Sequence, residues 1–234
     1  MLVLNGREVF TELSEIVEPA HTALVLIDLT IDDCGQGGFF ANQGRDMSLI
    51  DNALRNSKRI LDAARRMGVL RIHIDTPWWP DHKNISGPWL RFMITKRKMD
   101  PTSAGCMVAG TKGVEFMPDF KPRADELIVS KWRSSSFTGT NLDMVLRVNN
   151  IKTVMCIGVT TEGCIESTAR DSVFHDYYTV VVEDCVGTYD RDLHEASLKV
   201  QRSRVDVVHS DDVLKIWSGK TATGAKPRRT VAAE

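Results

Sequence analysis

The sequence predicts an α/β protein whose core is a doubly wound, Rossmann-like, six-stranded parallel sheet with helices on both faces. Three observations predict this fold. Runs rich in β-branched residues alternate with segments of helical periodicity along most of the 234 residues. Several runs are continuously apolar, as in strands that are covered on both faces. The composition, 42% hydrophobic and 26% charged, is that of an ordinary globular domain.

The individual elements follow from these patterns. The expected strands lie at 22–28, 69–75, 126–130, 153–158, 178–183 and 204–209. The expected helices lie at 47–67, 142–148, 163–176, 190–201 and 211–217. In the first helix, apolar residues such as Ile50 and Leu54 recur on one face, and Gly68 follows as a stop signal.

We expect one α/β hydrolase-type domain over 1–218, a long insertion at about 76–125 and a disordered tail at 219–234. The insertion contains two Trp-Pro clusters and no clear strand. A connection of that length often serves as a lid or a subunit contact, but a short helix with a surface loop explains it equally well. The tail is polar and lacks periodicity, which is typical of disorder.

Charge and cysteine content exclude several classes of protein. A net charge of -1 gives no overall field that would attract nucleic acid. No run approaches the ~20 apolar residues of a membrane span, and the first residues lack the pattern of a secretory signal. The five cysteines are irregularly spaced without a C-x-x-C pair, which argues against a zinc ribbon or a disulfide framework. We therefore expect a cytoplasmic protein without nucleic-acid or membrane partners.

Three candidate functional residues stand where expected strands end, at the edge where parallel sheets bind ligands. Asp28 ends the first strand and is either a helix cap or a working carboxylate. Lys131 follows the third strand and is either a surface lysine with a buried stem or a fixed cation. Cys164 follows the fourth strand, where a helix is expected to begin at Gly163 or Cys164. Together they supply an acid, a cation and a nucleophile.

The position of Cys164 suggests an activated thiol. A sulfur at a helix N-terminus lies near the positive end of the backbone dipole and near free N–H groups, which lower the pKa of a thiol. The same N–H groups can stabilise an oxyanion. Cys156 lies inside the fourth strand and is expected to be an inert core residue.

Three segments carry a family resemblance: ALVLID at 23–28, VSKWRSSSFTGTNLD at 129–143 and CIGVTTEGCIESTARDSVFHDYYTVVVEDCVG at 156–187. In this order they resemble the isochorismatase-like cysteine hydrolases, which include nicotinamidases and the N-carbamoylsarcosine, ureidoacrylate, biuret and triuret hydrolases. The resemblance covers about 22–217. It implies the isochorismatase-like variant of the fold and an Asp-Lys-Cys triad at Asp28, Lys131 and Cys164. It also implies a cis peptide between Val159 and Thr160, and an oxyanion hole formed by the backbone N–H groups of Thr160 and Cys164.

The sequence departs from its relatives in two places. Nicotinamidases carry an Asp-x-His-x-x-His metal cluster after the second strand, where this chain offers only Asp75 and His82. We therefore expect no metal and no cofactor. The D-x-Q-x-D-F motif that usually follows the first strand is replaced by Asp-Leu-Thr-Ile-Asp-Asp, which removes an amide and an aromatic ring and adds an acid.

We expect a cysteine-dependent amidohydrolase of a small ureido or carbamoyl compound, acting through a thioester-like intermediate. The alternatives are a nicotinamidase-like hydrolase of another small amide and a catalytically silent relative. Family resemblance also implies a homo-oligomer, either a dimer or a tetramer. The candidate substrate contacts are Asp33, Phe39, Phe40, Trp78, Trp79 and Gln201. For the two phenylalanines, an ordinary core position is the equal alternative.

Overall fold

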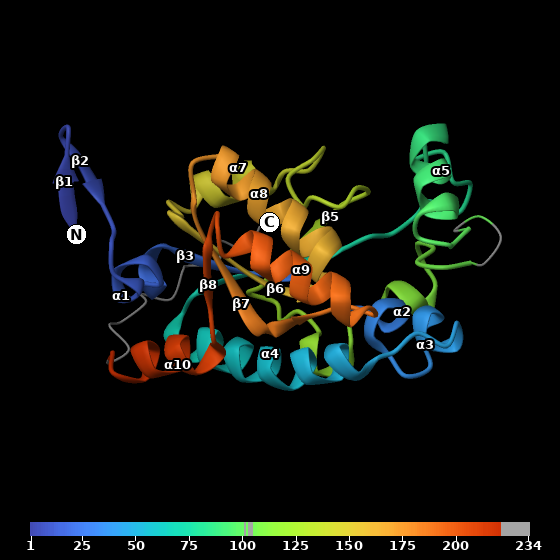
Figure 1. Ribbon diagram of the computed structural model, residues 1–234, viewed down its shortest axis with the longest axis horizontal. Helices are drawn as coiled ribbons and strands as arrows, with labels where there is room; N and C mark the ends of the chain where they lie inside the picture. Colours follow the sequence, from blue (N-terminus) through green and yellow to red (C-terminus); the bar gives the residue numbers. More distant parts are fainter. Residues whose placement is uncertain (101, 103–104, 221–234) are drawn as a thin grey trace, which may run out of the picture.

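The computed structural model describes residues 1–100, 102 and 105–220. Its centre is a six-stranded sheet in the order β5-β4-β3-β6-β7-β8, in which every neighbouring pair is parallel (Figure 1). The strands are β3 (Thr22–Ile27), β4 (Leu70–Asp75), β5 (Leu127–Ser130), β6 (Thr153–Val159), β7 (Tyr178–Gly187) and β8 (Asp206–Val208). The predicted fold class is confirmed.

The strand order creates a switch point between β3 and β6. The chain builds outward from β3 through β4 to β5 and then returns to the other side of β3 as β6. These two central strands pair from Thr22 with Thr153 to Ile27 with Gly158. At Gly158 φ is +119°, and a Cβ there would lie 2.1 Å from the Ile27 carbonyl oxygen, so only glycine fits. In doubly wound sheets, ligands bind beyond the carboxyl ends of the strands at such a point.

Helices cover both faces of the sheet (Figure 1). One face carries α4 (Ser48–Met67) and α10 (Ser210–Ser218), and the other carries α7 (Leu142–Val148), α8 (Glu166–Phe174) and α9 (Arg191–Gln201).

The buried strand β3 links the two apolar cores. Its alternate side chains point to opposite faces of the sheet. Leu24 and Leu26 belong to the cluster under α4, and Val25 and Ile27 belong to the cluster under α7 and α8. A strand between two helical layers must be apolar on both sides, which explains the continuous apolar run at 22–27.

Several element boundaries differ from the prediction. β7 continues to Gly187 rather than ending at 183, because a register shift between Cys156 and Gly158 lets β6 pair with it further along. The N-terminal hairpin of β1 (Leu2–Leu4) and β2 (Arg7–Val9) was not predicted, although its Asn-Gly turn is a strong hairpin signal. The remaining unpredicted helices are short: α1 (Leu13–Ile16), η1 (Pro19–His21), α2 (Ile31–Cys34) and α3 (Phe39–Asn42).

The insertion at 76–125 begins in a lobe at one end of the molecule, which carries α5, and returns to the main core, where Phe120 packs (Figure 1). Its described part contains α5 (Gly87–Thr95), η2 (Lys112–Val114) and η3 (Pro118–Phe120). The lobe packs on the body through a separate apolar cluster, which contains Phe40, Trp78, Met93, Met99, Cys106 and Met107. A short helix is present, as one of the two interpretations expected, and the lobe also has a place in the site described below.

The predicted tail at 219–234 lies outside the described residues from 221 onward. Of its first two residues, Gly219 follows α10, and the Lys220 ammonium donates to the Ser14 carbonyl oxygen at 3.0 Å. None of the helices in the described part of the chain combines the length and apolarity needed to span a bilayer.

Candidate active site

A cavity of about 660 Å³ opens where β3, β4, β5 and β6 end. Asp28, Thr76, Lys131 and Cys164 line its polar part, and α5 of the lobe contributes aromatic side chains such as Trp89. This volume suits a small molecule, and an apolar wall with a few convergent polar groups is typical of ligand pockets. The cavity is therefore the candidate active site.

Asp28, Thr76 and Lys131 form a closed triangle of polar contacts. The Lys131 Nζ lies 2.8 Å from Asp28 Oδ2 and donates to the Thr76 hydroxyl, also at 2.8 Å. That hydroxyl donates to Asp28 Oδ1 at 2.8 Å. Because all three side chains are buried, each polar group needs a partner, and the triangle provides one.

The sheet explains how these side chains meet. The Asp28 N–H donates to the carbonyl oxygen of Ile74, and the Lys131 N–H donates to that of Asp75, so both residues continue the strand pairing by one step. Lys131 is only 1% exposed, which contradicts the surface-lysine interpretation. The carboxylate of Asp28 contacts Thr76 and Lys131, and α2 begins after Thr30, so the helix-cap interpretation of Asp28 is not supported.

Cys164 lies in a π-helical turn, η4 (Thr161–Ile165), which leads into α8. The predicted helix at 163–176 therefore begins earlier, as a π-helical turn, and becomes α-helical only at Glu166. The Cys164 Sγ accepts a hydrogen bond from Lys131 Nζ at 3.3 Å. Of the five cysteines, all within the described residues, Cys164 borders the cavity and the other four are buried.

The predicted lowering of the Cys164 pKa is wrong for the empty cavity. Burial raises the pKa of this thiol to about 12, and the Lys131 charge lowers it only partly, while the Asp28 charge raises it further. The sequence argument considered only the helix terminus, whereas the closely packed cavity wall withdraws the sulfur from water. The resting side chain is therefore a thiol with a carboxylate beside it.

The charge of Lys131 is maintained despite its burial. Burial alone would lower the pKa of Lys131, but the neighbouring Asp28 charge and the hydrogen bonds raise it above its usual range. The cavity thus holds a permanent ammonium beside the sulfur.

The two residues of the expected oxyanion hole also lie in the cavity wall. The Val159–Thr160 peptide is cis, as the resemblance implied. Thr160 and Cys164 both line the cavity, and Thr160 is almost fully buried. The role of their N–H groups remains a prediction.

Three of the six predicted substrate contacts border the cavity: Asp33, Phe40 and Trp78. Asp33 accepts a hydrogen bond from the Thr30 hydroxyl at 2.7 Å through Oδ2. Burial and the nearby Asp28 charge raise the pKa of Asp33 to about 7, so its proton is exchanged near neutral pH. The acid that replaces the usual phenylalanine is therefore a pocket residue.

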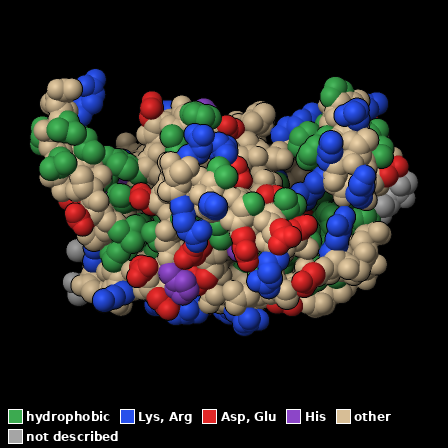
Figure 2. Space-filling view, viewed as in Figure 1, with side chains coloured by type: hydrophobic (Ala, Val, Ile, Leu, Met, Phe, Trp, Pro, Cys, Tyr) green, Lys and Arg blue, Asp and Glu red, His purple; other side chains and the backbone are tan. Residues whose placement is uncertain are grey.

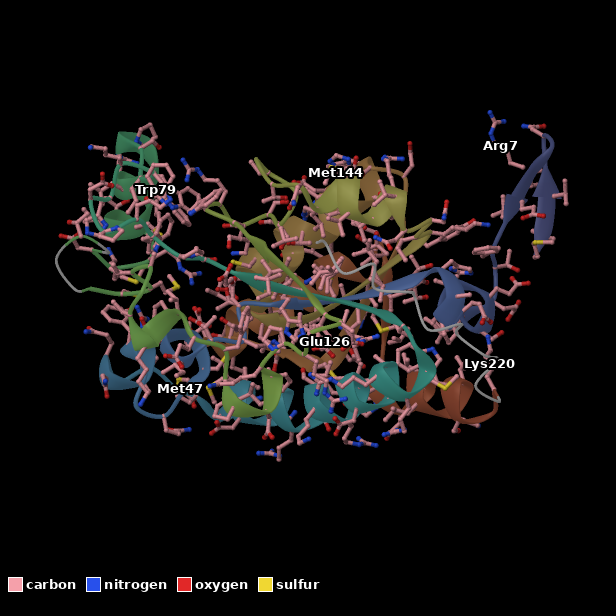
Figure 3. All side chains as sticks on the ribbon, turned by 180° about the vertical axis from the view of Figure 1, so that it is seen from behind. Arg7, Met47, Trp79, Glu126, Met144 and Lys220 are labelled. Carbon is pink, nitrogen blue, oxygen red and sulfur yellow. The ribbon has the colours of Figure 1, made fainter. Side chains whose placement is uncertain are left out.

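The other three predicted contacts do not line this cavity. Phe39 packs edge-on against Phe40, with ring centroids 5.2 Å apart, because consecutive residues of α3 point in different directions. Trp79 is 48% exposed on the lobe, where it packs against Trp132 (Figure 3). Gln201 is buried on α9 and donates to the Ser197 hydroxyl at 3.0 Å.

Sequence reasoning missed further cavity residues. Thr76 directly follows the predicted second strand, so the rule that selected Asp28 and Lys131 also applies to it. Arg97 and Glu162 both line the cavity and pair with each other at 3.2 Å; Glu162 follows the fourth strand, as Cys164 does, whereas Arg97 lies in a segment without a strand-end signal. Arg133, two residues after Lys131, lines the cavity as well.

A resident metal has no evident ligand set in the described part of the chain. No three His, Cys, Asp or Glu side chains gather there in a way that could hold a metal ion. The absence of a cofactor remains a prediction.

Comparisons with known proteins show the family and the fold of the chain. A family model for the isochorismatase domain matches residues 22–212. The chain is 31% identical over 174 residues to the ureidoacrylate amidohydrolase RutB of Agrobacterium fabrum, covering 72% of this chain and 76% of that protein. A cysteine hydrolase from Pseudomonas syringae pv. phaseolicola superposes with a TM-score of 0.75 at 22% identity, covering 87% of this chain and 95% of that one. For an N-carbamoylsarcosine amidase from Thermoplasma acidophilum, the TM-score is 0.62 at 25% identity, with 81% and 96% covered.

Proposed function

This chain belongs to the isochorismatase domain family, and from that premise we propose that it is a cysteine-dependent amidohydrolase. Its substrate is a small ureido or carbamoyl compound, from which it cleaves a carbon–nitrogen bond other than a peptide bond. The relatives named as ureidoacrylate amidohydrolase and N-carbamoylsarcosine amidase support this class of reaction.

One observation carries the proposal: a carboxylate, an ammonium and a thiol meet at the floor of one cavity. Lys131 contacts both Asp28, at 2.8 Å, and the Cys164 sulfur, at 3.3 Å. A nucleophile within reach of a base, with a third group that orients both, is the arrangement that covalent catalysis requires.

The first half of the reaction forms a covalent intermediate. The sulfur of Cys164 attacks the ureido carbonyl carbon while Asp28 takes the thiol proton. Because the resting thiol has a raised pKa, proton transfer accompanies the attack rather than preceding it. The N–H groups of Thr160 and Cys164 stabilise the oxyanion. Asp28 then gives the proton to the departing nitrogen, the carbon–nitrogen bond breaks, and a thioester-like acyl-enzyme remains.

The second half restores the enzyme. Asp28 accepts a proton from a water molecule, whose oxygen attacks the acyl carbon. The carbon–sulfur bond breaks, and the sulfur recovers its proton from Asp28. Lys131 stays protonated throughout, holds the carboxylate in place and stabilises negative charge that develops on the sulfur.

An ammonia-release assay tests the proposal. The substrates are biuret, triuret, ureidoacrylate and N-carbamoyl amino acids, each with and without a chelator. Cys164→Ala removes the nucleophile, so we expect turnover to fall at least about 10⁴-fold with an unchanged melting temperature. Cys185→Ala, at a buried cysteine of β7 outside the cavity, is the matched control and stays within about 3-fold of wild type.

Each outcome of this assay bears on one alternative. Full activity in folded Cys164→Ala, or no ammonia from any ureide with the wild type, contradicts the proposal, and the second result favours a silent relative. Turnover that a chelator abolishes contradicts metal independence.

A further inference from the structure

A guanidinium without a carboxylate partner lies in the wall of the cavity. Arg133 Nη1 donates to the carbonyl oxygens of Trp132, at 2.6 Å, and Asn84, at 3.4 Å. Its guanidinium carbon lies 5.2 Å from the ring centroid of Trp89, another residue of the cavity wall. Among the described residues, no aspartate or glutamate lies within ion-pair distance of Arg133, and no hydrogen bond engages its Nε or Nη2. The side chain is thus held in place with its charge uncompensated.

The second arginine of the cavity differs in this respect. Arg97 pairs with Glu162 at 3.2 Å, so its charge is balanced within the wall. The positive charge that remains for a ligand in this part of the cavity is therefore that of Arg133. Lys131 is balanced in the same way by Asp28.

The lobe adds a positive field around the cavity. The segment 87–98 contains Arg91, Lys96, Arg97 and Lys98 and no acidic residue. Trp89, Phe92, Met93 and Arg97 of this segment line the cavity. Figure 2 shows Lys and Arg side chains gathered on the lobe that carries α5. Basic residues around a cavity with apolar walls attract anionic ligands.

We propose that Arg133 binds the carboxylate of the substrate, so that the substrate is a ureido acid rather than a neutral ureide such as biuret or triuret. This inference rests on the proposed function and narrows its substrate class. A carboxylate matches the planar donors of a guanidinium with two parallel hydrogen bonds. A neutral ureide would cover the Arg133 charge without compensating it, which costs binding free energy.

The experiment compares matched substrates and matched variants. N-carbamoylglycine and N-carbamoyl-β-alanine are each assayed beside their methyl esters, which keep the ureido group and lose the negative charge. Wild type, Arg133→Gln and the control Arg55→Gln, which removes an exposed arginine of α4 that does not line the cavity, are compared by ammonia release. Melting temperatures check that each variant is folded.

We expect the wild type to prefer each acid over its ester by about 10- to 100-fold in kcat/KM, as for a charge-assisted hydrogen-bonded pair. Arg133→Gln removes this preference, mainly through a higher KM, while Arg55→Gln keeps it. An arginine that only holds its loop in place would lower activity on acid and ester alike and leave their ratio unchanged.

Two results overturn the inference alone: an unchanged preference in Arg133→Gln, or Cys164-dependent turnover of biuret that exceeds that of both acids. Absence of ammonia from every ureide tested overturns the proposed function as well.

Discussion

Two buried clusters of charged residues in the described part of the chain invite comparison: one borders the cavity described above, and the other does not line it. The cavity cluster consists of Asp28, Thr76, Lys131 and Cys164. The sealed cluster consists of Arg65, Arg71, His73 and Glu126. Each contains a buried carboxylate with a cation beside it. They differ in which edge of the sheet they occupy and in whether a nucleophile lies beside the ion pair.

In the sealed cluster the carboxylate is saturated with donors. Glu126 Oε1 accepts from Arg65 at 2.7 Å, and Oε2 contacts His73 Nε2 at 2.8 Å and accepts from the Arg123 N–H at 3.1 Å. Burial alone would raise the pKa of Glu126, but these donors lower it to about 2. Glu126 precedes β5 and lies near the middle of the view in Figure 3, whereas Trp79 lies on the lobe at one end. Both oxygens of this carboxylate are thus engaged, and the His73 Nδ1, which has no hydrogen-bond partner among the described residues, is buried.

The cavity cluster ends in a group that is not saturated. Asp28 and Lys131 satisfy each other, but the Cys164 sulfur contacts only the ammonium among its hydrogen-bond donors in the described chain, and it borders the cavity. A buried ion pair is therefore no sign of catalysis by itself. What distinguishes the site is a nucleophile beside the pair, at the carboxyl edge of the sheet.

The largest expected effect is the difference in activity between a variant of Asp28 and a variant of Glu126. Asp28→Asn keeps the size of the side chain and removes the base, so kcat/KM for a ureide should fall about 10³-fold or more. Glu126→Gln should stay within about 3-fold of wild type when assayed well below its melting temperature. Equal losses of kcat/KM in folded Asp28→Asn and Glu126→Gln would show that the two clusters do not differ in their contribution to activity.

The second expected effect is on the stability of the sealed cluster. Glu126→Gln leaves Arg65 without its buried anion and Arg71 with only the exposed Asp125, and should cost about 3 kcal/mol, measured by urea unfolding at pH 7. Because the folded pKa of Glu126 is lowered, its contribution is complete above its ordinary value of 4.5 and is lost as the pH falls toward 2. The stability difference between wild type and variant should therefore shrink across that interval. A constant difference would assign the cost to packing.

The smallest effect concerns the resting thiol. The Asp28 charge and hydrogen bond raise the pKa of Cys164, and the Lys131 charge lowers it. Asp28→Asn should therefore make alkylation of Cys164 by iodoacetamide at pH 7.5 faster by about tenfold, although turnover is lost. Mass spectrometry identifies the labelled cysteine, with Cys164→Ala as the control. Slower labelling in Asp28→Asn would show that the carboxylate deprotonates the thiol even without substrate.

The sequence predicted the sheet and the centre of the site for one reason. Parallel strands end at a common edge, so polar residues that follow apolar runs, such as Asp28 and Lys131, meet there. The extension of β7 depends on a register shift in β6, which no local pattern reveals. The lobe lacks periodicity, so the directions of Trp78 and Trp79 could not be distinguished. The raised pKa of Cys164 results from packing of segments far apart in the chain. The compartment, the oligomeric state and the disordered tail remain predictions.

The protonated state of Lys131 also determines which atom reacts. Primary amines attack activated carbonyl carbons, so a deprotonated lysine beside the proposed thioester-like intermediate would be a competing nucleophile. With its pKa raised by Asp28, the Lys131 nitrogen keeps its lone pair bound to a proton and cannot form a urea adduct. The contact that holds the carboxylate of Asp28 thus leaves the sulfur of Cys164 as the nucleophile of the two in the proposed reaction.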